Sequence, residues 1–265
     1  GTAPNSLSAG RDAQFARFYQ LEYKDFTDDV DFYVQYALAL DPEKALPVLE
    51  LGCGTGRIVC ALAHAGFQVT GIDSSEAMLD VAKTEIERQG LGAKASLVAG
   101  DMRRIGPVGG PFNLAFCALN TFSYLASTGE QLAMLQGIHP LLVQHGVLIL
   151  DLTPPYDHLL PPSDGEVVHQ GSFADEVSGG MVHKFVTGRA NRAAQSHEVT
   201  LIYDVEAADG TLARVSRCDT MRWTSRYEMP LLLEAAGYRV DKLYGSYDLD
   251  DFADESERMI FVART

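Results

Sequence analysis

The stretch Val48-Leu49-Glu50-Leu51-Gly52-Cys53-Gly54-Thr55-Gly56-Arg57 joins an apolar strand to a glycine-rich turn that opens a helix. Glycines at 52, 54 and 56 let the backbone turn sharply and approach a ligand closely, because no Cβ covers the backbone N–H groups. A strand, a glycine turn and a helix in this order are typical of sites that bind nucleotide-like ligands. The stretch therefore predicts such a ligand without naming it.

Composition and charge set the class of protein. The 265 residues suffice for one domain with an insertion. A net charge of −15, from 36 acidic and 21 basic side chains, argues against a nucleic-acid partner, which needs a basic surface. No apolar run reaches membrane-spanning length, and residues 1–11 lack the apolar core of a secretion signal. We expect a cytoplasmic protein that binds neither nucleic acid nor membrane; a homodimer is left open.

The four cysteines, at positions 53, 60, 117 and 218, form no Cys-x-x-Cys pair and have no histidine at ligand spacing. We therefore expect reduced, mostly buried thiols and no metal. Cys53 lies in the glycine turn, where we expect a small residue that packs rather than a nucleophile.

Strands and helices alternate between residues 47 and 152. The pattern predicts strands at 47–51, 67–72, 95–99, 112–117 and 146–152, and helices at 56–65, 75–89 and 129–142. This alternation implies an α/β fold, a parallel sheet with helices on both faces.

Two regions depart from this alternation. Aromatic side chains between 12 and 40 have the spacing of two helices, which gives an N-terminal helical lid over 1–44. Alternating segments and glycine turns predict an antiparallel β insertion over 161–224. The helix 227–236 and the strands 238–245 and 257–264 then return to the first architecture, so the sheet domain is assigned to 45–160 and 225–265.

Acidic side chains accompany three of the predicted strands. Glu50 precedes the glycine turn, where a carboxylate repels a pyrophosphate but suits a cationic ligand. Asp73 closes the next strand, at the spacing at which a carboxylate binds two ribose hydroxyls. Asp101 follows the third strand and is next to Met102, beside the position that an adenine would take.

Segments 50–56, 71–79 and 100–102 together resemble three motifs of the class I S-adenosylmethionine-dependent methyltransferases. The resemblance covers 45–155 and 220–265. It implies a Rossmann-like seven-stranded sheet with its last strand antiparallel, and S-adenosyl-L-methionine as cofactor, which leaves as S-adenosyl-L-homocysteine. The cofactor-binding residues that it implies are Tyr33, Glu50, Gly52, Cys53, Gly54, Arg57, Asp73, Ser74, Met78, Asp101, Met102 and Leu119.

Several of these residues have a purely structural alternative. Asp73 or Ser74 would serve as the N-cap of the helix 75–89, and Asp101 would cap the turn that follows it. Met78 fits a core position as well as a ligand contact. Caps alone would not explain why the two aspartates follow the glycine turn in this order and spacing, which favours the cofactor.

The resemblance extends to the small-molecule branch of that family. Residues 119–122, Leu-Asn-Thr-Phe, lack the Asn/Asp-Pro-Pro-aromatic motif of enzymes that methylate adenine or glutamine amides, and the Pro-Cys pair of cytosine C5 methyltransferases is missing. The aromatic lid and the insertion after the fifth strand resemble amino-sugar N-methyltransferases and, more distantly, glycine N-methyltransferase. N- or O-methylation of a metabolite or natural product is implied, driven mainly by in-line alignment.

Aromatic and basic side chains supply the candidates for catalysis. Tyr19, Tyr23 and Tyr33 would close over a sulfonium methyl, or else form a helix stripe packed on the core. His158 is the best-placed candidate base, with a solvated loop histidine as the alternative. Two other functions stay open: binding of the cofactor without methyl transfer, and a nicotinamide oxidoreductase. Glu50 and the Gly-x-Gly-x-Gly spacing disfavour the oxidoreductase.

Overall fold

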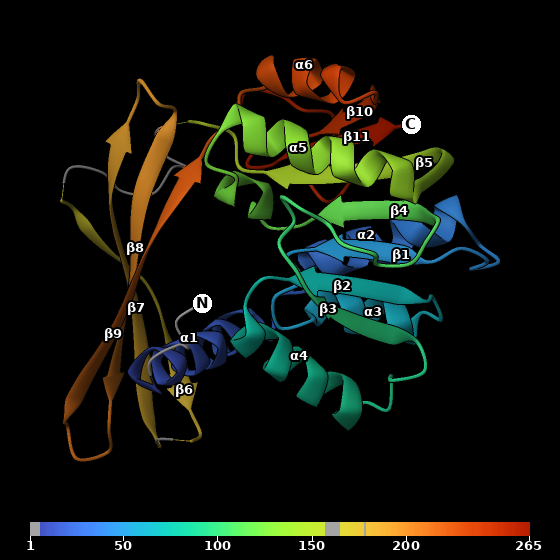
Figure 1. The fold of residues 1–265 in the computed structure, drawn as a ribbon. Coiled ribbons are helices and arrows are strands. Elements are labelled where there is room, and N and C mark those ends of the chain that lie inside the picture. Colours follow the sequence, from blue (N-terminus) through green and yellow to red (C-terminus); the bar gives the residue numbers. More distant parts are fainter. Residues whose placement is uncertain (1–5, 157–164, 178) are drawn as a thin grey trace.

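The computed structural model describes residues 6–156, 165–177 and 179–265, which form two β-sheets and the helices that cover them (Figure 1). The larger sheet contains β1 (Val48–Leu51), β2 (Val69–Asp73), β3 (Ala95–Ala99), β4 (Phe112–Cys117), β5 (Leu142–Leu152), β10 (Arg239–Tyr244) and β11 (Met259–Arg264). Its seven strands run in the order β10-β11-β5-β4-β1-β2-β3. Strands β1 to β5 are parallel, and β11 is antiparallel to both of its neighbours.

Helices cover both faces of the larger sheet. They are α2 (Asp28–Leu40), α3 (Arg57–His64) and α4 (Glu76–Arg88) on one face, and α5 (Thr128–Ile138) and α6 (Glu228–Ala235) on the other. Side chains of β5 alternate between the two cores: Leu148 and Leu150 face α5 and α6, and Ile149 faces α2 and α3. Burial on both faces explains why this strand is apolar throughout.

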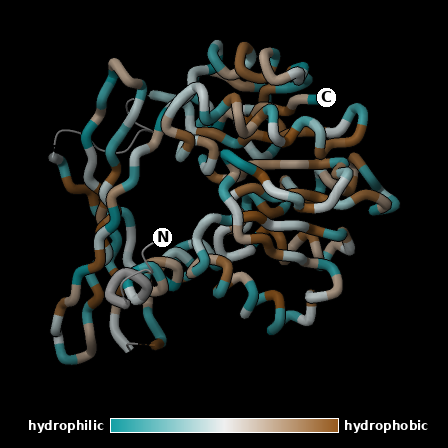
Figure 2. Tube along the Cα trace, in the orientation of Figure 1, coloured by the Kyte–Doolittle hydropathy of each residue, from teal (hydrophilic) through white to brown (hydrophobic). Residues whose placement is uncertain are grey.

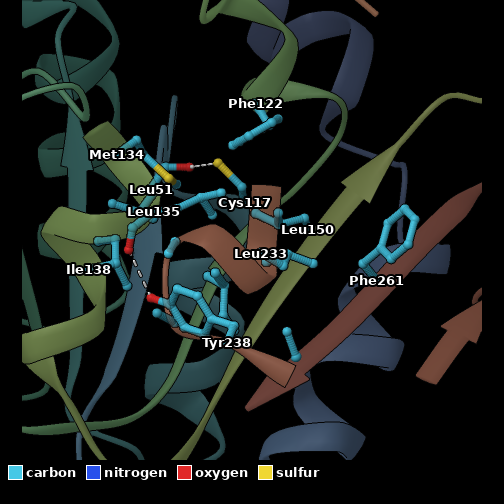
Figure 3. Close-up of a cluster of buried hydrophobic side chains, with 14 of the residues drawn as sticks. Leu51, Cys117, Phe122, Met134, Leu135, Ile138, Leu150, Leu233, Tyr238 and Phe261 are labelled. Atoms are coloured by element: carbon cyan, nitrogen blue, oxygen red, sulfur yellow. Dashed lines mark hydrogen bonds between the residues drawn. The ribbon is translucent and has the colours of Figure 1, made fainter. Parts of the chain in front are cut away.

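Figure 3 shows the core between α5, α6 and the sheet, with Phe122, Met134, Leu233 and Phe261 among its side chains. Its polar groups are paired. The Tyr238 hydroxyl donates to the Leu135 carbonyl at 3.1 Å, and the Cys117 thiol lies 3.5 Å from the Leu51 carbonyl. A phenol buried in this way would otherwise leave its hydroxyl unsatisfied, at a cost in stability.

The smaller sheet is the insertion, with β6 (Val167–Asp175), β7 (Gly180–Asn191), β8 (Ser196–Glu206) and β9 (Leu212–Arg222) in sequential antiparallel order. Helix α1 (Ser6–Tyr23) lies between this sheet and α4 (Figure 1). Phe15, Phe18, Met78, Val182 and Tyr203 form the cluster that joins the three elements. The insertion thus packs against α4 through α1, and β9 also contacts the 3₁₀ turn Thr121–Tyr124 that follows β4.

The structure confirms the predicted fold class, including the antiparallel last strand and the β insertion. The region after α5 differs from the prediction. The helix ends at Ile138 instead of continuing to 142, because Pro140 follows and a short 3₁₀ turn replaces its last turn. Strand β5 already begins at Leu142, which pairs with Phe112 of β4.

Candidate functional site

A cavity of about 850 Å³ lies at the carboxyl ends of β1, β2, β3 and β4, and its opposite wall is the insertion. Strand β1 is flanked by β2 on one side and β4 on the other, so the chain reverses its direction of winding at this point. Parallel α/β sheets bind ligands at such points, where loops from adjacent strands diverge. Two walls define the site: the glycine-loop side (Gly52, Gly54, Asp73, Ser74, Asp101, Met102) and the insertion side, formed by the cavity-lining side chains of β6 to β9 and of Glu166 just before β6.

The glycine turn is required by its surroundings. Gly52 has a φ of +68°, and a Cβ built on it would lie 2.2 Å from Cγ2 of Thr121. Gly54 has a φ of +52°, and the nearest atom to its virtual Cβ is a Tyr19 ring carbon at 3.7 Å. A side chain at Gly52 would collide with the loop after β4, and one at Gly54 would project toward the tyrosines of α1.

Asp73 organises the glycine turn from the end of β2. One of its carboxylate oxygens accepts the Gly54 N–H and the other accepts the Ser75 N–H, each at 2.8 Å. Ser75 is the N-cap of α4, with its hydroxyl accepting the Met78 N–H at 3.3 Å. The cap is therefore neither Asp73 nor Ser74, and both of these residues line the cavity.

Glu50 lies beneath the turn, 3% exposed, and its Oε2 has no hydrogen-bond partner. Burial raises the pKa of its carboxyl group well above the usual value, against the opposing influence of the Arg57 guanidinium and of a hydrogen bond from the Val59 backbone. The raised pKa favours the protonated carboxyl group, and its unpaired oxygen leaves one buried hydrogen-bonding position unfilled.

Asp101 is more exposed and is already paired. Its carboxylate accepts from the Arg103 side chain, with the closest contact at 2.6 Å, and Arg103 also reaches Glu130 at 3.1 Å. These hydrogen bonds to Arg103 lower the pKa of Asp101. Asp101, Met102 and Arg103 all line the cavity.

The loop after β4 completes the glycine-loop side with two residues in the left-handed region, Leu119 at φ +45° and Asn120 at φ +67°. Asp151, fully buried at the end of β5, accepts the Leu119 N–H at 3.0 Å. Tyr247 donates to the same carboxylate at 2.8 Å, and Arg258 forms an ion pair with it. These bonds offset the strain of two consecutive residues that are not glycine.

Aromatic side chains of α1 lie between the two walls. The rings of Tyr19 and Tyr23 stack with their centroids 4.5 Å apart, and both line the cavity. Burial is the main cause that raises the pKa of both phenols, so they remain protonated above the usual tyrosine value of about 10. Neutral hydroxyls at this place act as hydrogen-bond donors and acceptors, not as bases.

Polar groups on the insertion side bond mainly to one another or to α1. The Lys184 ammonium lies 2.5 Å from Glu22 of α1, and the Tyr203 hydroxyl donates to the same carboxylate at 3.1 Å. Arg217 forms an ion pair with Asp219 at 2.8 Å. The residues that make these contacts belong to β7, β8, β9 and α1, which lie far apart in the sequence. The pairing register of the insertion brings the strand residues together.

The structure brings most of the predicted site residues together. Those that line the cavity are Tyr19, Tyr23, Gly52, Gly54, Asp73, Ser74, Met78, Asp101, Met102 and Leu119. Four predicted residues lie outside its lining: Tyr33, Glu50, Cys53 and Arg57. His158 lies outside the described residues.

Three of the four residues outside the lining have side chains that pack against or bond to neighbouring residues. Tyr33 is fully buried and stacks on Phe116 with the ring centroids 4.2 Å apart. The Arg57 guanidinium binds both carboxylate oxygens of Asp29, at 2.5 and 2.6 Å, which ties the glycine turn to α2. A Cβ built on Gly71 would lie 2.8 Å from the Cys53 sulfur, so the thiol packs closely against Gly71.

Sequence reasoning did not single out several cavity residues. Tyr124 lines the cavity, where burial and then the charge of Asp219 raise the pKa of its phenol against the opposing charge of Arg217. The only signal for it was the polar and aromatic segment after the fourth strand. Lys184, Arg217 and Asp219 gave no signal, because alternation predicts that a strand exists but not which neighbours it meets.

Comparison with known proteins finds methyltransferases both by sequence and by fold. Residues 48–146 match the family model described as a methyltransferase domain. The cypemycin N-terminal methyltransferase of a Streptomyces species is 29% identical over 215 residues, 81% of each chain. Glycine N-methyltransferase of Oryctolagus cuniculus is 27% identical over 212 residues, 74% of this chain and 69% of that protein.

Among solved structures, the sugar N-methyltransferase KedS8 from Streptoalloteichus sp. ATCC 53650 has a TM-score of 0.74 to this chain at 21% identity, over 94% of this chain and 92% of that one. This likeness is one of fold, and it includes the insertion because it covers nearly the whole chain. Within the described residues, no helix has both the length and the apolar character needed to cross a membrane.

Proposed function

We propose that the chain is a class I S-adenosylmethionine-dependent methyltransferase that methylates the nitrogen of a small-molecule amine. One observation carries the proposal. A single cavity joins the glycine-loop side to the insertion side, with tyrosines between them and a surplus of carboxylates in its walls. The methyl donor and its acceptor would therefore meet in one enclosed space.

The glycine-loop side fits S-adenosylmethionine. Gly52 and Gly54 line the cavity without side chains of their own, and Glu50, which precedes them, has a buried Oε2 without a hydrogen-bond partner. We assign Asp73 to the ribose and the walls of Met78 and Met102 to the adenine. When bound, this cofactor supplies a methyl group whose carbon–sulfur bond breaks as the bond to nitrogen forms, with the electron pair left on sulfur.

The charge of the cavity favours an amine as acceptor. Of the described residues that line it, five are carboxylates (Glu22, Asp73, Asp101, Glu166, Asp219) and three are cations (Arg103, Lys184, Arg217). A surplus of negative charge in a walled cavity attracts ammonium ions and repels carboxylates and phosphates. The names of the two curated relatives and of KedS8 point the same way, since each refers to a nitrogen acceptor or to an N-terminus.

Tyr19 and Tyr23 would orient the acceptor. Their neutral hydroxyls can accept a hydrogen bond from an N–H group, which directs the lone pair of the nitrogen along a fixed line. The amine needs that lone pair free, so its proton goes to water before transfer. We therefore expect the methylation rate to rise with pH through the pKa of the amine. Ionisation of Tyr19 or Tyr23 should cause no further change in the rate below about pH 10.

Tyramine tests the proposal, because one molecule offers both an amine and a phenol. The protein is incubated with ¹³C-methyl S-adenosylmethionine and tyramine, and the product is identified by NMR. N-methyltyramine is expected. Methylation of the phenol oxygen would contradict the amine assignment while leaving methyl transfer intact.

A protein that binds the cofactor without transferring its methyl group would give a third result. Calorimetry would then show S-adenosylmethionine binding, while no S-adenosylhomocysteine would form with tyramine, hexylamine or glucamine. That outcome would contradict the proposed reaction.

A further inference from the structure

Of the eleven described residues that line the insertion side, where the acceptor would lie, five are apolar and six are polar (Glu166, Gln170, Lys184, Tyr203, Arg217 and Asp219). On the cavity-facing side of the insertion, alternate positions carry Val168, Val186, Val199, Leu201 and Met221. The pairing register places Val168, Val186 and Leu201 side by side across three strands. Val168, Val186 and Leu201 form an apolar row opposite the glycine-loop side. Hydrophilic and hydrophobic residues are mixed along the strands of this sheet (Figure 2).

Four of the six polar side chains on the same wall are already engaged. Lys184 and Tyr203 bond to Glu22, and Arg217 bonds to Asp219 while its guanidinium lies 5.0 Å from the centre of the Phe15 ring. A ligand with more hydroxyls than Glu166 and Gln170 can bind would have to break these contacts or leave its own groups unsatisfied. Either choice costs free energy, because buried polar groups need partners.

From this wall we infer that the acceptor is an amine on an apolar aliphatic or aromatic body, rather than a hydroxyl-rich or zwitterionic amine. The inference rests on the amine methylation proposed above and adds the substrate class. The amine lies toward Tyr19, Tyr23 and Tyr124, and its apolar body covers Val186 and Leu201. The chain thereby differs from what the names of its relatives indicate, which are a sugar and glycine.

Hexylamine and glucamine test this inference as a matched pair, because both are six-carbon primary amines and only glucamine carries hydroxyls. Initial rates of S-adenosylhomocysteine formation are measured over a range of pH, so that the different basicities of the two amines are taken into account. We expect kcat/KM for hexylamine to be at least tenfold higher, since each methylene buried contributes about fourfold. Equal rates, a preference for glucamine or no turnover of hexylamine would overturn the inference.

4-Hexylphenol distinguishes failure of the inference from failure of the proposed function. If the phenol is methylated and hexylamine is not, the assignment of nitrogen is wrong, and the substrate class proposed here falls with it. If both amines are methylated without preference, nitrogen methylation stands and only the apolar acceptor is overturned.

Two neighbouring substitutions locate the preference on this wall. Leu201→Thr changes the cavity face of β8, and Ile202→Thr makes the same kind of change one residue along, on the opposite face. We expect Leu201→Thr to raise the KM for hexylamine about tenfold and Ile202→Thr to change it less than twofold. Both variants should bind S-adenosylhomocysteine as the unchanged protein does, which checks their folding. An equal effect of the two substitutions on KM would overturn the inference.

Discussion

The two walls of the cavity are built in different ways. The glycine-loop side depends on backbone: Gly52 and Gly54 take left-handed conformations, and the carboxylate of Asp73 binds two N–H groups. The insertion side depends on side chains from three strands and α1, which bond across sequence separations as large as the 181 residues between Glu22 and Tyr203. One wall is therefore specified locally and the other only by the folded sheet.

This difference predicts how each wall responds to substitution. A backbone site tolerates almost no added atom, whereas a side-chain wall can be altered gradually. Changes on the glycine-loop side should therefore affect cofactor affinity strongly, and changes on the insertion side or on α1 should affect turnover of the acceptor.

The largest effect is expected at Gly52. Gly52→Ala places a Cβ against Thr121 at a positive φ, so we expect affinity for S-adenosylhomocysteine to fall by about 3 kcal/mol, roughly a hundredfold. Gly90→Ala is the matched control, because Gly90 has a φ of +69° and nothing within 4 Å of its virtual Cβ. The control should lose only stability, about 1 kcal/mol. Equal affinities of the two variants in calorimetry would show that the turn does not bind the cofactor.

Asp73 should come next. Asp73→Ala removes the acceptor of the Gly54 and Ser75 N–H groups together with the proposed ribose contact, so we expect a loss of about 1–3 kcal/mol in cofactor affinity. Asp101→Ala should cost less, because Asp101 is more exposed and is engaged by Arg103. A larger loss at Asp101 than at Asp73, measured by the same titration, would reverse the proposed order.

Tyr23 tests the space between the walls. Tyr23→Phe keeps the ring that stacks on Tyr19 but loses the hydroxyl, so kcat should fall about tenfold while the affinity for S-adenosylhomocysteine stays the same. Tyr36→Phe removes a hydroxyl from α2, away from the cavity lining, and should leave kcat unchanged. A fall in cofactor affinity without a fall in kcat would assign Tyr23 to the cofactor.

Substitution of Glu50 should have the smallest effect, and this effect should be a change in stability that depends on pH. Its pKa is raised in the folded protein, so its contribution to stability is greatest at low pH and is lost as the pH rises through the raised pKa. Glu50→Gln removes this loss, and the variant should therefore gain stability over the unchanged protein as the pH increases. Denaturant titrations at several pH values measure the difference. A constant difference between pH 5 and 9 would contradict the expected ionisation.

The sequence predicted the elements of the larger sheet and most of the glycine-loop side, because those residues stand at strand ends with fixed local spacing. Asp73, Asp101 and Met102 are examples. It did not predict that Arg57 binds Asp29 or that Tyr33 stacks on Phe116, because both contacts depend on where α2 docks. Lys184 and Asp219 were missed for a related reason: the register of an insertion decides which face, and which neighbour, a side chain meets.

The most direct test of the account is a crystal structure of the protein with S-adenosylhomocysteine and tyramine bound together. We predict that the sulfur lies on the glycine-loop side, with the tyramine nitrogen between it and the hydroxyls of Tyr19 and Tyr23, and with the ring of tyramine against Val186 and Leu201. Tyramine bound outside this cavity, or with its phenol oxygen facing the sulfur, would contradict the account.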